Sequence, residues 1–107
     1  GIDVIPRMMK NEFGLSYSYK DSVPSDLVIL NNIKKDYPVL VSLRGKSGIH
    51  HLCVTYGINV VSGYVTIMDP MFGFTTVYTK NNEYTYTDPT RDRTWTFDSG
   101  ICRYWSA

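Results

Sequence analysis

Short segments rich in β-branched and aromatic residues follow one another from residue 39 onward. Each is bounded by Gly, Pro, Asn, Asp or Ser, and they occupy residues 39–43, 51–58, 63–69, 74–79, 83–87 and 93–97. Val, Ile, Thr, Tyr and Trp favour extended strands, and the bounding residues favour turns that reverse the chain. The sequence therefore predicts a curved antiparallel sheet of about six strands.

The residues before this region predict two short helices. Residues 3–12 have a weak helical pattern that Gly14 ends, and a second helix is expected within 22–38, with Ser25 as its N-cap and Pro38 at its end. Residues 15–20 alternate in the manner of a short strand. Helices followed by strands, without strict alternation, indicate the α+β class.

Length and charge limit the kinds of partner. A chain of 107 residues fits one domain, here taken as residues 1–107, and its net charge of +1 gives no electrostatic reason to expect nucleic acid or an anionic membrane as a partner. No apolar run approaches the roughly 20 residues that a membrane-spanning helix needs. The chain starts with Gly1 and carries no signal-peptide pattern, so we expect a processed chain or a piece of a larger protein.

The two cysteines, Cys53 and Cys102, are too few for a disulfide framework and do not have the spacing of a metal site. Two buried free thiols are the favoured interpretation, and one disulfide is the alternative.

Two adjacent histidines, His50 and His51, begin the strand predicted at 51–58. Neighbouring strand residues point to opposite faces, so the two imidazoles do not share one site. No third ligand is spaced to complete a metal site, so we expect no metal and no cofactor.

Asp69 ends the next strand, and the hairpin geometry pairs it with one of these histidines. If the turn centres near Val60, His51 lies directly opposite Asp69, with Cβ atoms roughly 4.5–5.5 Å apart. A slip of one residue would select His50 instead. An aspartate on an imidazole fixes its tautomer and stabilises the imidazolium form, which suits a general base. A satisfied buried polar pair is the alternative.

The stretch YPVLVSLRGKSGIHHLCVTYGINVVSGYVTIMDPMFG resembles the C-terminal half of papain-like cysteine peptidases, in the branch of bacteriocin-leader peptidases and avirulence-effector proteases of plant pathogens. The resemblance extends over roughly residues 5–80 and lies in 38–43, Gly48, His51, 54–57, 67–70 and Gly73. It implies a papain-like subdomain in which His51 is the general base and Asp69 its orienting partner.

The resemblance also exposes a missing nucleophile. Residues 1–47 contain no cysteine, Cys53 lies on the strand of the base itself, and Cys102 lies beyond the matched region. A nucleophile has to approach the imidazole from a separate element. We therefore expect the His/Asp portion of a bacterial, secreted or host-delivered cysteine peptidase acting on a peptide or protein. Its thiol would come from an upstream segment or separate chain, and this chain alone would be inactive.

The alternative function is a non-catalytic β-rich module that binds a peptide or a glycan. It is suggested by the Tyr, Thr and Trp residues concentrated in 78–97. Exposed aromatic rings form platforms for such ligands, although the same residues are also common in ordinary strands.

Overall fold

A computed structural model describes residues 4–45, 48, 50–69, 73–80, 83–88 and 93–107. The elements in chain order are α1 (Val4–Phe13), β1 (Ser18–Lys20), α2 (Asp26–Lys34), β2 (Val39–Arg44), β3 (His50–Asn59), β4 (Tyr64–Asp69), β5 (Gly73–Lys80), β6 (Glu83–Asp88) and β7 (Arg93–Cys102). Two helices and an antiparallel sheet place the fold in the α+β class, as predicted.

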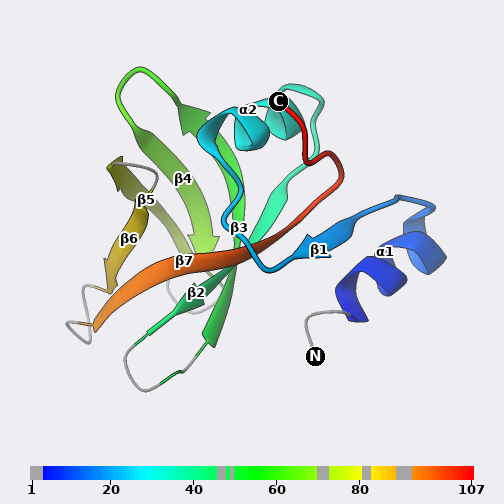
Figure 1. The fold of residues 1–107 in the computed structure, drawn as a ribbon, viewed down its shortest axis with the longest axis horizontal. Coiled ribbons are helices and arrows are strands. Elements are labelled where there is room, and N and C mark those ends of the chain that lie inside the picture. The colour runs from blue at the N-terminus through cyan, green and yellow to red at the C-terminus, as the bar shows by residue number, and fades with distance from the viewer. Residues whose placement is uncertain (1–3, 46–47, 49, 70–72, 81–82, 89–92) are drawn as a thin grey trace.

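The strands follow the order β1-β7-β2-β3-β4-β5-β6, and a further pairing between β6 and β7 closes six of them into a barrel (Figure 1). The ten-residue β7 makes this closure possible. Its first residues pair with β6 and its last residues pair with β1, while β2 lies along its other side. Closure leaves the barrel strands without a continuous open edge.

The expected number of about six strands is not confirmed, because the described residues contain seven. The additional strand is β1, within the alternating stretch 15–20. It is stable as a strand because it pairs with the end of β7, from Ser18↔Cys102 to Lys20↔Gly100. The same pairing extends β7 to Cys102, beyond the predicted end at residue 97. Pro70 and the side chains of residues 70–93 lie outside the described part of the chain.

The interior of the barrel contains the inward-facing residues of the alternating strands. On β4 every second residue is buried: Val65 and Ile67 are fully buried, and Asp69 continues the same face. These side chains pack in one cluster with residues of β2, β3, β7 and α2: Val28, Ile29, Val39, Val41, Leu43, Cys53, Trp95, Phe97 and Cys102. A polar side chain on such a face therefore lies inside the barrel.

Both predicted helices form, and their ends have identifiable causes. Ser25 accepts a hydrogen bond from the Val28 backbone N–H at 3.2 Å and so caps α2 as predicted. The helix ends before Pro38 because Asp36 takes a left-handed φ of 64°. Gly14, with φ 67°, ends α1, and its N–H donates to the Lys10 carbonyl at 3.0 Å. None of the residues of α1 is buried, and Figure 1 shows this helix apart from the barrel.

No helix in the described ranges combines the length and the apolar character needed to cross a membrane.

Gly100 of β7 is closely packed against a rigid ring. A Cβ at this position would lie 2.5 Å from Cγ of Pro24 and 3.3 Å from Trp105. We expect Gly100→Ala to lower the free energy of unfolding by about 1–3 kcal/mol, because overpacking forces the backbone to shift. Urea denaturation measures the change. Gly57→Ala is the control, since its nearest contact is the Thr66 hydroxyl at 3.3 Å. Equal effects of the two changes would contradict the packing explanation.

Candidate active site

A bulge in β3 decides which histidine shares a face with Asp69. The hairpin starts with Asn59↔Tyr64, and the register shifts between Thr55 and Gly57. If the pairing that begins with Asn59↔Tyr64 continued without the shift, Asp69 would lie opposite Val54, on the same face as His50. The shift leads instead to Val54↔Met68, so the following position sets Asp69 opposite Cys53, on the face of His51.

The predicted register is therefore corrected by two residues. The residue opposite Asp69 is Cys53, and His51 lies two residues further along β3 on the same face. The turn is longer than one centred on Val60: it ends at Gly63, which has φ 79° and whose N–H donates to the Asn59 carbonyl at 2.9 Å. A displacement of two residues preserves the face because strand side chains alternate with a period of two.

His51 and Asp69 are joined by a short hydrogen bond. The distance from Nε2 of His51 to Oδ1 of Asp69 is 2.7 Å, and the exposed fractions of the two side chains are 16% and 0%. A carboxylate only accepts hydrogen bonds, so Nε2 carries a proton and donates it. The carboxylate thereby fixes both the tautomer and the direction of the ring.

The remaining ring nitrogen of His51, Nδ1, carries the lone pair of this tautomer. Within the described residues it has no hydrogen-bond partner. The imidazole also contacts Trp95 of β7, with ring centroids 5.5 Å apart. Trp95 is accommodated by Gly45, where a Cβ would lie 3.0 Å from the indole ring. Asp69 and Trp95 thus hold the His51 ring in place, and its Nδ1 is left to accept a proton.

His50 points to the other face, as predicted. Its Nε2 lies 3.0 Å from Oδ2 of Asp98, and its side chain is 56% exposed. The pair borders a pocket of about 360 Å³ lined by Tyr19, Asp21, Ser42, His50, Asp98 and Ser99. An exposed polar contact of this kind contributes little to stability. His50 thus also has a carboxylate partner, but its side chain is exposed whereas that of His51 is largely buried.

Both cysteines are fully buried and free, which confirms the favoured interpretation of the two thiols. Burial raises the pKa of Cys53 to about 12, and the nearby Asp69 carboxylate adds to the shift. Burial likewise raises the pKa of Cys102 to about 12, against a smaller opposing effect of Lys20. An activated nucleophile requires the opposite shift, because the thiolate is the reactive form.

We expect neither thiol to react with Ellman's reagent in the folded protein at pH 8, where a pKa of about 12 leaves the thiolate at roughly one part in ten thousand. Both should react after unfolding in urea. The folded pKa lies above the ordinary value of 9.0, so this contribution to stability is complete below pH 9 and is lost as the pH rises towards 12. Rapid reaction of one thiol in the folded state would contradict the burial.

One feature was missed by the sequence analysis, which expected no third metal ligand near the histidines. His51, Cys53 and Asp69 each offer one donor atom, and these atoms all lie within 4.8 Å of one another. His51 and Cys53 share a face because they are two residues apart, which the sequence does indicate. The proximity of Asp69 to both depends on the bulge. Trp95 was also missed as a neighbour of His51, because it is brought there only by barrel closure.

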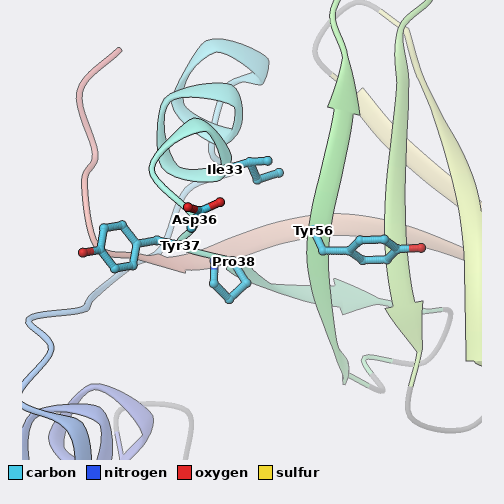
Figure 2. Close-up of a pocket in the computed structure, with 5 residues that line it drawn as sticks. All are labelled: Ile33, Asp36, Tyr37, Pro38 and Tyr56. Carbon is cyan, nitrogen blue, oxygen red and sulfur yellow. The ribbon is translucent and has the colours of Figure 1, made fainter.

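A second pocket, of about 310 Å³, lies at the other end of β3 (Figure 2). It is lined by Ile33, Asp36, Tyr37, Pro38 and Tyr56. The rings of Tyr37 and Tyr56 point away from each other in Figure 2, so they do not stack around a common ligand position. Tyr56 is five residues from His51, or roughly 16 Å along an extended strand, so this pocket is separate from the His51–Asp69 pair.

Comparison with known proteins finds no family model that matches the chain, and no curated protein or solved structure with significant similarity to it.

Proposed function

We propose that this chain supplies the general base and its orienting carboxylate, His51 and Asp69, to a papain-like cysteine peptidase that cleaves a peptide or protein substrate. The observation that carries the proposal is the 2.7 Å hydrogen bond from Nε2 of His51 to a fully buried Asp69 side chain. The barrel would then be the papain-like C-terminal subdomain of that enzyme. Bacterial origin and secretion or delivery to a host belong to the same proposal.

The chemistry follows from the protonation of the imidazole. Nδ1 takes the proton of a cysteine thiol, and the resulting thiolate attacks the carbonyl carbon of the scissile peptide bond. The Nδ1–H of the imidazolium then protonates the leaving amine as the C–N bond breaks and a thioester remains. Nδ1 next removes a proton from water as its oxygen attacks the thioester, and Nδ1–H then returns that proton to the leaving sulfur, which releases the acid and the thiol. Asp69 stabilises the imidazolium throughout the cycle.

The nucleophilic thiol comes from outside these 107 residues. The sequence has two cysteines, and both are buried thiols with a pKa raised to about 12. Cys53 is also on the strand of His51, two residues away, so it cannot present its sulfur as an independent element would. An upstream segment or a separate chain is therefore part of the proposal.

The test compares the natural gene product that contains these residues with the 107-residue chain alone. We expect the gene product to hydrolyse a peptide library and to lose this activity after alkylation with iodoacetamide. The 107-residue chain should be inactive at the same concentration. Hydrolysis by the 107-residue chain alone, the absence of any hydrolysis by the gene product, or hydrolysis that survives alkylation would each refute the proposal.

Within the described residues, the alternative, a non-catalytic module for a peptide or glycan, is supported by the pocket around Tyr37, Pro38 and Tyr56. The aromatic side chains of 78–93 that suggested it lie outside the described part of the chain. The two tyrosine rings diverge (Figure 2), whereas sugar and peptide platforms use rings that face the ligand together. The hydrogen-bonded and buried His51–Asp69 pair is the more specific feature, so the peptidase proposal is preferred.

A further inference from the structure

We propose that His51, Cys53 and Asp69 form a zinc-binding site at the end of the barrel. Each of the three residues offers one donor atom, and all three atoms lie within 4.8 Å of one another. Two come from alternate positions of β3 and the third from the end of β4. They are thus held by paired strands of one barrel rather than by a loop, which fixes their relative positions.

The chemistry of the three donors matches zinc. Thiolate sulfur, imidazole nitrogen and carboxylate oxygen are its ordinary protein ligands, at roughly 2.3 Å for sulfur and 2.0–2.2 Å for nitrogen and oxygen. A tetrahedral ion with these bonds separates its ligand atoms by about 3.2–3.8 Å. The atoms already lie within 4.8 Å of one another, so side-chain movements alone would bring them to these separations. On binding, the Cys53 thiol would release its proton to solvent, and a zinc-bound Nε2 of His51 would give up its 2.7 Å hydrogen bond to Asp69 and leave the ring proton on Nδ1. Hard cations such as Mg²⁺ would not select the sulfur.

The charges also balance. A thiolate and a carboxylate neutralise a divalent ion, while the imidazole binds as a neutral ligand. This balance matters because Cys53 and Asp69 are both buried, and an uncompensated charge at such a position is costly. Three protein ligands leave the fourth position of zinc for water, and the partial exposure of His51 provides access to it.

The Cys53 thiol provides an independent observation. It is fully buried and, within the described residues, makes no hydrogen bond, although the Asp69 carboxylate and the His51 ring lie beside it. Valine would fill the same buried volume, so packing alone does not explain why a sulfur atom lies beside an imidazole and a carboxylate at this position. A metal ion gives the sulfur a partner that the apolar packing of the barrel does not.

Zinc would also regulate the proposed peptidase. Coordination removes His51 from proton transfer, so an occupied site would be inactive. This consequence rests on the proposed function, whereas metal binding does not, and binding is therefore measured without an activity assay.

The experiment titrates the 107-residue chain with Co²⁺, a spectroscopic substitute for Zn²⁺, and then displaces it with Zn²⁺. We expect one equivalent to bind, with a near-ultraviolet sulfur-to-cobalt charge-transfer band that Zn²⁺ abolishes. Cys53→Ser should remove the band and weaken Zn²⁺ binding at least about tenfold, since even outer-shell partners of a metal site contribute 10–100-fold to affinity. Cys102→Ser is the matched control and should retain the band.

A second pair of variants gives an answer even if Cys53→Ser does not fold. His51→Gln should weaken Zn²⁺ binding at least about tenfold, as expected for a direct ligand. His50→Gln, its sequence neighbour on the other face, should leave the affinity within about threefold, because an exposed side chain outside the cluster contributes little. Absence of the band in the wild type, its persistence in Cys53→Ser, or equal losses in the two histidine variants would overturn the assignment.

Discussion

For the proposed peptidase, His51→Gln is expected to lower kcat/KM for peptide hydrolysis by at least about 10³-fold, because removing the general base of such a triad eliminates most of the chemical catalysis. Glutamine keeps much of the shape of the imidazole but cannot take a proton at neutral pH. The thiol then stays protonated, and the leaving amine has no proton donor.

The adjacent histidine is the control for this experiment. His50→Gln removes an imidazole from the other face of the same strand, where its partner is Asp98 at 3.0 Å. Its kcat/KM should stay within about threefold of the wild-type value, because His50 lies on the face opposite to His51 and Asp69 and takes no part in the proposed proton transfer. Circular dichroism of both variants checks that the barrel is intact. Comparable losses in the two variants, or activity retained in His51→Gln, would contradict the role assigned to His51.

Asn32→Leu is expected to lower the free energy of unfolding by about 2–4 kcal/mol, because it removes buried hydrogen bonds and deprives the N–H and C=O of Tyr104 of their partner. Asn32 is fully buried in α2. Its Nδ2 donates to the carbonyls of Val28 at 2.8 Å and Tyr104 at 2.6 Å, and its Oδ1 accepts from the Tyr104 N–H at 3.0 Å. The side chain thus attaches the C-terminal residues to α2, beside which they lie in Figure 1.

The neighbouring Asn31 provides the matched control. Its Nδ2 donates to the Ser106 carbonyl at 2.9 Å, but this hydrogen bond is exposed, so water can replace it. Asn31→Ala should therefore cost less than about 1 kcal/mol. Urea denaturation followed by tryptophan fluorescence measures both changes, and Trp105 reports directly on the C-terminal residues. A loss in Asn32→Leu no larger than that in Asn31→Ala would refute the role of the buried amide.

Local patterns were sufficient for the elements and for part of the site. The strand segments, the Ser25 cap and the end of α1 at Gly14 depend on residues within a few positions of each other, where propensities and capping rules act. The opposite directions of His50 and His51 follow from strand alternation alone. These features are encoded within one element, so a single sequence is enough to predict them.

The His51–Asp69 pair shows where local patterns stop. The sequence supplied the two residues and a hairpin, but the assumed turn near Val60 gave a register two residues from the observed one. A longer turn ending at Gly63 and a bulge at Tyr56 together set the final face. An extra residue in one strand exchanges the inward-facing and outward-facing side chains of the residues that follow it. No strong local sequence signal marks where such a bulge occurs.

By itself the sequence determined the α+β class, the helix caps and the face on which each histidine stands within its strand. Only the tertiary structure decided that β6 and β7 close a barrel, that Asp69 reaches His51 and Cys53, and that Trp95 contacts the imidazole. The physical reason is that the contacts of the site join residues 16 or more positions apart, and that closure also needs β7 to pair with the distant β2, with Ile101 opposite Leu40. Their geometry depends on the summed packing and register of several strands rather than on the preferences of any one of them.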